Sequence, residues 1–153
     1  MTRNFKIERD HVFGETGFPL DVSIWEEHGD YPPHTHAFSE IAIVLAGTGI
    51  HRVCDQTLAF KSGDIFVTHG NRPHAYESTR NLTLINVTYD PKLITSERLD
   101  CASLPGYQAL FVIEPALQRR ESPQRHLSLD RDTLIHVKHL CDQIRLELKE
   151  REA

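Results

Sequence analysis

The sequence predicts an all-β barrel or sandwich followed by one C-terminal α-helix. Between residues 40 and 90, short runs rich in aliphatic and aromatic residues alternate with turn residues. Their spacing of about 8–12 residues is typical of β-barrels and sandwiches. After residue 130 apolar residues instead recur at steps of three and four, as on one face of a helix. The 153 residues, 39% of them hydrophobic, are enough for one domain with its own core.

Residues that favour turns separate the predicted strands. Gly47-Thr48-Gly49 is expected to be a turn, and Ser62-Gly63-Asp64 another, because glycine and small polar residues adopt turn conformations easily. Downstream of Pro91 we expect a short helical piece at 93–98, a strand at 107–113 and then a polar connector. The strands predicted before Pro91 are 18–25, 41–45, 50–53, 57–60, 65–68, 74–77 and 82–89.

The last predicted element is a helix over residues 130–153, with Asp130 or Asp132 as its N-cap. Its apolar residues form one narrow seam, at about two positions in seven. The seam has two interpretations: it packs on its own barrel, or it pairs with the helix of a partner chain, as narrow seams do in coiled coils. The seam residues are Leu134, Val137, Cys141, Ile144 and Leu148.

Charge and composition exclude several classes of protein. The net charge is −5 and the longest basic run is Arg119-Arg120, so this chain by itself is not expected to bind DNA. No run of about 18 apolar residues predicts a transmembrane helix, and charges interrupt the first ten residues where a signal peptide would be apolar. Cys54, Cys101 and Cys141 lack metal-site spacing and are odd in number, which favours a cytoplasmic protein without a disulfide framework.

The histidines are concentrated in one stretch that suggests a metal site. Residues two apart in an extended chain point to the same face, so His34 and His36 share a face, and Glu40 joins them if the strand continues. His74 lies downstream, directly before a predicted strand. Three imidazoles and a carboxylate suit one divalent ion such as Zn, Ni, Mn or Fe. The alternative is that the same four residues line a polar pocket without a metal.

The segment 29–47 resembles the first signature motif of the cupin barrel, G…HxHx3Ex6G. The second cupin motif is degenerate here, since only Gly63 and His74 keep the expected residues. The resemblance implies a double-stranded β-helix, or jelly-roll, barrel. It also implies that the family's four metal-ligand positions are filled by His34, His36, Glu40 and His74.

Longer stretches resemble the N-terminal sensing domain of AraC-type bacterial regulators. These stretches are 34–41, 47–53 and 62–67, and the segment 72–89 is similar in particular to the rhamnose-responsive branch. The resemblance implies a barrel that binds a small effector, often a sugar, and helices after the barrel that form a homodimer. It also implies that DNA is bound only through a separate helix-turn-helix domain that this chain does not contain. The chain then divides into an N-terminal arm (1–17), a cupin barrel (18–115), a connector (116–129) and a dimerisation helix (130–153).

Four further residues are candidates for the effector site, in addition to His34, His36, Glu40 and His74. Trp25 could hold the apolar face of a sugar or simply pack in the core. Tyr76 should point the same way as His74 by strand parity, whereas the face of His51 is open. Asn86 is polar within an apolar strand and needs partners if buried, from a ligand or from a core network. The remaining histidines are predicted to be solvated: His11, His28, His69, His126, His136 and His139.

The predicted function is therefore a small-molecule sensing and dimerisation domain of an AraC-type transcription regulator. The runner-up is a stand-alone metal-dependent cupin enzyme of the dioxygenase or sugar isomerase type. No acid–base pair outside the metal shell is evident in the sequence, which favours the sensor over the enzyme.

Overall fold

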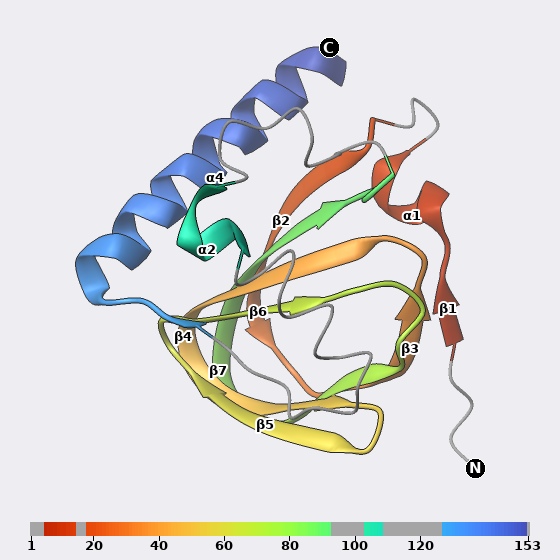
Figure 1. The fold of residues 1–153 in the computed structure, drawn as a ribbon, viewed down its shortest axis with the longest axis vertical. Helices are drawn as coiled ribbons and strands as arrows, with labels where there is room; N and C mark the ends of the chain where they lie inside the picture. Colours follow the sequence, from red (N-terminus) through yellow and green to blue (C-terminus); the bar gives the residue numbers. More distant parts are fainter. Residues whose placement is uncertain (1–4, 15–17, 93–102, 109–126, 153) are drawn as a thin grey trace.

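The computed structural model describes residues 5–14, 18–92, 103–108 and 127–152 (Figure 1). The predicted all-β barrel with a C-terminal helix is confirmed. In chain order the elements are β1 (Phe5–Ile7), α1 (Arg9–Phe13), β2 (Leu20–His28), β3 (Tyr31–His36), β4 (Ser39–Val53), β5 (Gln56–Lys61), β6 (Asp64–Thr68), β7 (His74–Tyr89), α2 (Pro105–Tyr107), β8 (Leu127–Ser128) and α4 (Arg131–Glu152).

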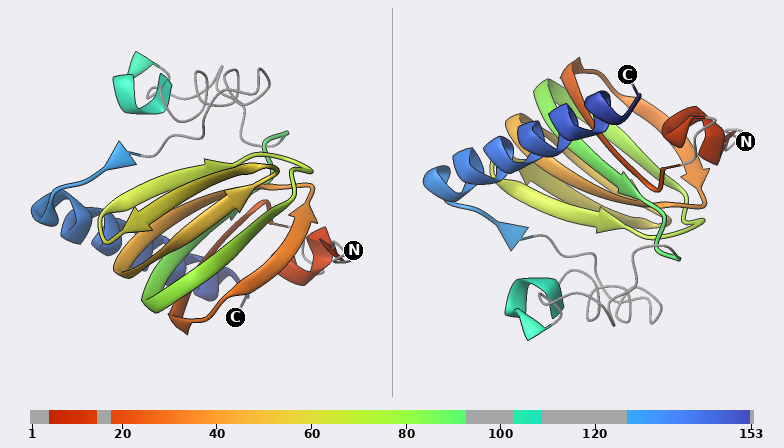
Figure 2. Two further views of the ribbon diagram at one scale, coloured as in Figure 1. Left: turned by 90° about the horizontal axis from the view of Figure 1, so that it is seen from below. Right: turned by 90° about the horizontal axis from the view of Figure 1, so that it is seen from above.

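The strands form one curved sheet in which β7 is central. The hydrogen-bonded order is β1-β3-β7-β4-β6-β8, with β2 also paired to β7 and β5 to β4. The first half of β7 pairs with β3 and the second half with β2, while β4 follows it along both halves. The strands therefore wrap around an interior, and α4 lies across the outside of the wrapped sheet (Figure 2).

The predicted turn at Gly47-Thr48-Gly49 is wrong, because β4 continues through it as one bent strand. Pairing with β7 is kept across register shifts between Val44 and Ile50. Gly47 has φ +85°, and a Cβ there would lie 2.4 Å from two carbonyl oxygens of β7. Gly47 therefore permits a β-bulge and a close approach of the β4 and β7 backbones. In sequence, such a bulge resembles a turn. Likewise, the predicted strands 74–77 and 82–89 are two halves of β7.

Strand parity separates an inner from an outer apolar cluster. Inside the barrel, Ala42 and Val44 of β4 pack with Leu84 of β7 and with aromatic rings of β5, β6 and β7. Outside it, the neighbouring residues Ile43 and Ile85 belong to a second cluster, which α4 covers. Each strand thus contributes alternate residues to two different surfaces.

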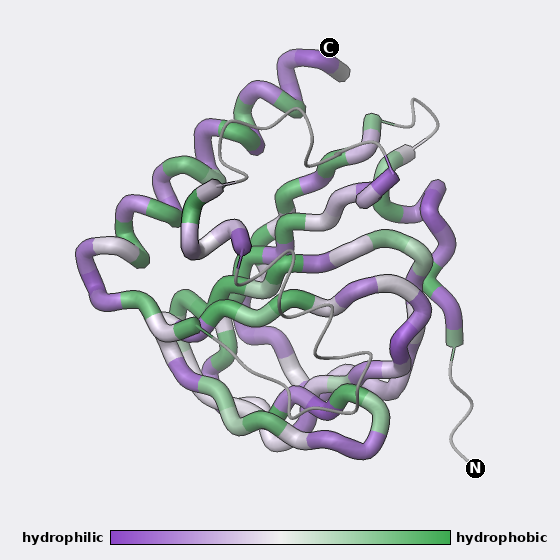
Figure 3. Tube along the Cα trace, in the orientation of Figure 1, coloured by the Kyte–Doolittle hydropathy of each residue, from purple (hydrophilic) through white to green (hydrophobic). Residues whose placement is uncertain are grey.

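Helix α4 begins as predicted. The Asp130 carboxylate accepts a hydrogen bond from the backbone N–H of Thr133 at 2.8 Å, so Asp130 is the N-cap. Along α4, apolar and polar residues alternate, so that both kinds recur along the whole helix (Figure 3). The five seam residues, Leu134, Val137, Cys141, Ile144 and Leu148, all pack in the outer cluster of the barrel.

This packing is the first of the two interpretations of the seam. Cys141 is buried and the other four side chains are partly buried against the chain's own sheet. The apolar side chains that α4 leaves exposed are different ones. Ile135, Leu140 and Leu146 expose 58%, 43% and 63% of their surface.

The predicted arm and connector contribute strands to the sheet. In the arm, β1 pairs in parallel with β3, and Phe13 of α1 packs edge-on against Phe38 at 5.5 Å. In the connector, β8 pairs with β6. The predicted helical piece at 93–98 lies outside the described residues, as does most of the predicted strand at 107–113, whose first residue ends α2. Within the described part of the chain, no helix is both long and apolar enough to cross a membrane.

Candidate functional site

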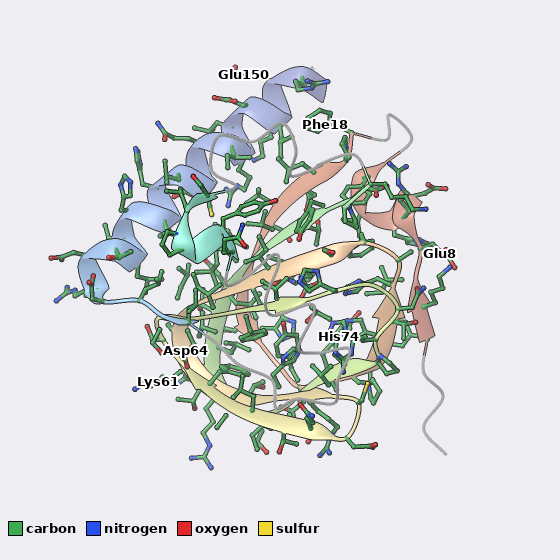
Figure 4. All side chains as sticks on the ribbon, viewed as in Figure 1. Glu8, Phe18, Lys61, Asp64, His74 and Glu150 are labelled. Carbon is green, nitrogen blue, oxygen red and sulfur yellow. The ribbon has the colours of Figure 1, made fainter. Side chains whose placement is uncertain are left out.

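Three histidines from two adjacent strands meet inside the barrel. His34 and His36 lie on β3 and His74 begins β7, directly opposite His34 in the pairing register. One ring nitrogen from each lies within 4.8 Å of those of the other two. His74 is labelled among the interior side chains in Figure 4. The predicted shared face of His34 and His36 is confirmed, since both are buried.

Backbone carbonyls fix the orientation of all three rings. A carbonyl oxygen can only accept, so each Nδ1 must carry the hydrogen, and in a neutral imidazole the lone pair is then on Nε2. Metal-binding histidines are commonly oriented in this way. The bonds run from His34 Nδ1 to the Pro32 oxygen (3.0 Å), from His36 Nδ1 to the Phe38 oxygen (2.7 Å) and from His74 Nδ1 to the Arg72 oxygen (3.2 Å).

Burial keeps these imidazoles neutral. Desolvation lowers the pKa of His34, brings that of His36 to about 4 and holds that of His74 well below its usual range. Among the residues that the structure describes, the buried Nε2 atoms of His36 and His74 have no hydrogen-bond partner. Neutral imidazoles with converging free lone pairs are a donor set that a divalent metal ion fits.

Glu40, the fourth predicted ligand, lies beside this group without joining it. Its Oε2 is 3.9 Å from His36 Nε2, and its Oε1 accepts a hydrogen bond from the Tyr76 hydroxyl at 3.3 Å. Burial raises the pKa of Glu40 to about 7, and the Tyr76 bond opposes that rise. The structure therefore brings three of the four predicted ligands together and leaves Glu40 as their neighbour.

A cavity of about 600 Å³ opens next to the histidine centre, the group formed by His34, His36 and His74. Its floor consists of polar side chains from three adjacent strands, which we call the polar grid. In the pairing register Asp21 of β2, Thr88 of β7 and Glu40 of β4 stand in one row across three strands. Ser23 and Asn86 stand side by side in the next row. All five line the cavity. The Asn86 Oδ1 and Thr88 Oγ1 atoms are buried without a hydrogen-bond partner in the described part of the chain, so a ligand that donates to them would satisfy them.

Aromatic side chains form the rim of the same cavity. Trp25 follows Ser23 on the inner face of β2, is half exposed and contacts His28 edge-on at 6.0 Å. His28 also lies 5.8 Å from Tyr31, and Tyr31 lies 5.9 Å from Phe5 of β1. A polar floor below an aromatic rim is the usual anatomy of a site for a small polar molecule.

The N-terminal segment closes one side of the cavity. Residues of β1 and α1, among them Ile7, His11 and Val12, belong to its lining. The cationic Lys6 in this wall is paired with Glu8 at 3.0 Å (Glu8 is labelled in Figure 4). Among the described residues that line the cavity, Lys6 is the only Lys or Arg, so these residues offer an anionic ligand little compensation.

The predicted effector residues divide into two groups. Trp25, His34, Glu40, Tyr76 and Asn86 line the cavity. His36 and His74 lie behind it in the histidine centre, and His51 lies deeper, stacked on Phe66 and Tyr76 with ring centroids 4.4 and 5.1 Å away.

Several lining residues were not predicted. His28 was expected to be solvated and is instead partly buried in the aromatic rim, because a bulge in β2 turns it toward Tyr76 at 5.4 Å. The alternation of Asp21, Ser23 and Trp25 along β2 could have indicated the first two, whereas no sequence signal placed β1 against β3. The unpredicted lining residues are Phe5, Lys6, Ile7, Glu8, His11, Val12, Asp21, Ser23, His28, Tyr31, Phe38 and Thr88.

Solved structures similar to this chain include a cupin-2 domain protein from Shewanella frigidimarina and a protein with a double-stranded β-helix domain from Klebsiella pneumoniae. The first is 20% identical with a TM-score of 0.42 and covers 45% of this chain and 69% of its own. The second is 17% identical with a TM-score of 0.42 and covers 46% and 67%.

Curated relatives include the HTH-type transcriptional activator RhaR of Escherichia coli K12 and that of Shigella flexneri serotype 5b. Each is 28% identical over 109 residues, which are 71% of this chain and 39% of the relative. The chain thus spans about two fifths of the length of these relatives. The AraC-like ligand binding domain family matches residues 19–148, which include the barrel and most of α4. The chain belongs to this family of AraC-like ligand-binding domains.

Proposed function

We propose that this chain is the sensing domain of a transcription regulator and that its effector is a small uncharged polyhydroxy compound of the sugar class. The observation that carries the proposal is the polar grid in the cavity floor. Its side chains offer mostly acceptors, and two of these, on Asn86 and Thr88, lack partners among the residues that the structure describes. Hydroxyl groups of a sugar are the donors that such a floor requires, and Trp25 gives the apolar ring face a surface to pack on.

The charge of the wall favours a neutral effector over an acidic one. The carboxyl groups of Asp21, Glu40 and Glu8 line the cavity. The ammonium group of Lys6, which also lines it, is paired with Glu8. A sugar acid or sugar phosphate would therefore lose hydration without gaining a charged partner. The sugar class also agrees with the resemblance of residues 72–89 to the rhamnose-responsive branch.

Parts of the protein that gain contacts when the effector binds are candidates for transmitting the signal. An effector shifts an equilibrium only if it binds two states with different affinity. The wall formed by β1 and α1 is held by three residues of parallel pairing in β1 and by the contact of Phe13 with Phe38, and it would gain contacts from a bound ligand. We therefore propose that this wall orders or tightens when the effector binds.

A divalent metal ion is a second expected component of the site. His34, His36 and His74 would hold it through Nε2, and a bound ion would supply a Lewis acid able to polarise an effector oxygen. The protein's own contribution is to keep the three rings neutral and oriented through the carbonyls of Pro32, Phe38 and Arg72.

The assembly we propose is a homodimer that contacts DNA through a part of the regulator other than this domain. The five seam residues are occupied by the barrel, so a dimer formed by α4 would use its outward face. Ile135 and Leu146 are eleven residues apart, about three helical turns, and so lie on the same side of α4. Both are more than half exposed.

Ligand titration by calorimetry tests the effector class. We expect one or more neutral sugars in a panel to bind, and matched sugar acids to bind at least about tenfold more weakly, a difference of about 1.4 kcal/mol. Thr88→Val should weaken binding, because it removes one hydroxyl from the floor. Thr68→Val is the matched control, since Thr68 is equally buried and flanks Glu40 on the other side, outside the cavity.

Two results would contradict this proposal. Preferential binding of sugar acids would refute the argument from charge, and equal effects of Thr88→Val and Thr68→Val would refute the assignment of the floor. The same samples address the enzyme alternative. Nuclear magnetic resonance spectra of a bound sugar, recorded over hours with Zn²⁺ or Fe²⁺ present, should show the sugar unchanged if the domain is a sensor.

A further inference from the structure

The Glu40 carboxyl is shared between two neighbours. One oxygen accepts from the Tyr76 hydroxyl at 3.3 Å, and the other lies 3.9 Å from His36 Nε2, beyond hydrogen-bonding distance. The ring nitrogens of His34, His36 and His74 form a group that Glu40 does not complete. Whether a bound metal ion gains a carboxylate ligand therefore depends on what holds Glu40.

The Tyr76 ring is held firmly, so its hydroxyl has a fixed place. Tyr76 is 3% exposed and stacks on His51 of β4 with centroids 5.1 Å apart and planes inclined by 24°. Phe60 of β5 contacts the same ring edge-on at 6.1 Å. Because rings from two other strands pack against Tyr76, the hydroxyl cannot follow a carboxylate that moves toward the histidines.

The Glu40–Tyr76 pair also lies on the cavity side of the centre. Both residues line the cavity, whereas His36 and His74 do not. An effector in the cavity would thus meet Glu40 and Tyr76 on its way to the centre. If Glu40 filled the position on this side, an effector oxygen could not occupy it.

We propose that Tyr76 is a positioning residue that holds Glu40 out of the three-histidine centre and so keeps the cavity side of that centre open to an effector oxygen. This inference rests on the metal site of the proposed function. Removing the hydroxyl frees Glu40, whose Oε2 is already 3.9 Å from His36 Nε2, to become a fourth ligand. Tyr76 therefore sets the ligand number without touching the metal.

Titration of the metal-free protein with Co²⁺ tests this, because the visible spectrum of Co²⁺ reports ligand type and number. In the otherwise native protein, Glu40→Gln should leave the spectrum unchanged and the affinity within about threefold. Tyr76→Phe should shift the spectrum and tighten Co²⁺ binding by about tenfold. The double variant Tyr76→Phe/Glu40→Gln should return to the native spectrum, since the released carboxylate is gone.

Tyr31→Phe is the matched control, because it removes a phenol hydroxyl from the same cavity but not the one bonded to Glu40. A native spectrum is expected for it. If Glu40→Gln alone changes the spectrum and weakens Co²⁺ binding more than about tenfold, Glu40 is already a ligand and the positioning role of Tyr76 is refuted while the metal site stands. If Tyr76→Phe behaves like Tyr31→Phe, the role is likewise refuted. If no variant and not even the native protein binds Co²⁺, the metal site fails and this inference fails with it.

Discussion

Replacing His51 with Phe should remove part of the acid sensitivity of folding. His51 is fully buried, and its ring stacks on those of Phe66 and Tyr76. Burial, with a smaller contribution from His34, lowers the pKa of His51 from 6.5 to about 3. The folded protein therefore keeps this ring neutral at pH values where the unfolded chain has already bound a proton.

The sign and size of the effect follow from proton linkage. The unfolded state binds more protons than the folded state below pH 6.5, so stability falls as the pH drops from 6.5 toward 3. Between about pH 7.5 and 5.5 the statistical weight of the unfolded state rises about tenfold through this one group, which is about 1.4 kcal/mol. Glu40 has the opposite effect. Because its pKa is raised to about 7 in the folded protein, the protein loses stability through this group as the pH rises from 4.5 to 7. The difference in pH dependence between His51→Phe and the native protein therefore measures the contribution of His51.

Urea unfolding at the two pH values measures that difference. The native protein should lose about 1.4 kcal/mol more than His51→Phe, which is about 0.7 M in the urea midpoint at an m value of about 2 kcal/mol/M. His136→Gln, which changes an exposed histidine on α4, should keep the native pH dependence. Parallel pH dependences of the native protein and His51→Phe would refute the reasoning.

Three other predictions concern α4, the metal site and the bend in β4. Ile144→Glu should lower the melting temperature while the folded protein remains a dimer. Leu146→Glu should instead give monomers in sedimentation at unchanged stability. Zn²⁺ at about 100 times its Kd should stabilise the native protein by about 2.7 kcal/mol in thermal unfolding and should not stabilise His36→Ala. Gly47→Ala should destabilise by about 2 kcal/mol or more in urea unfolding, because its Cβ would lie 2.4 Å from two carbonyl oxygens, while Gly29→Ala meets nothing within 4 Å and should be nearly neutral.

Local periodicity was sufficient to predict the features that depend on one strand or one helix. The shared direction of His34 and His36 follows from the period of two along a strand, and His74 and Tyr76 share the interior in the same way. The Asp130 cap and the buried seam of α4 follow from equally local rules. What the seam packs against was not predictable, because a narrow apolar stripe fits its own sheet and a partner helix equally well.

Features that depend on pairing between distant segments could not be predicted. The Gly47-Thr48-Gly49 segment has the composition of a turn, and only its continued pairing with β7 makes it a bulge. The wall formed by Phe5 to Val12 lines the cavity because β1 pairs with β3, and neither segment signals that pairing. Glu40 was predicted as a ligand from its spacing, whereas its hydrogen bond to Tyr76, thirty-six residues away, could not be predicted from that spacing.

The effector cavity and the surface of α4 are two faces of the same strands, and this arrangement constrains how a signal could travel. Along β2, Asp21 and Ser23 line the cavity, while Val22 and Ile24, which alternate with them, pack in the cluster that α4 covers. On β7, Val87 stands between two residues of the polar grid and belongs to the same outer cluster. A strand that shifts to satisfy a ligand on its inner face must move its outer side chains as well, because the sheet is one layer thick and closely packed. The lining of the cavity and the contact surface of α4 therefore lie on opposite faces of β2 and β7, so that one rearrangement of these strands would alter both.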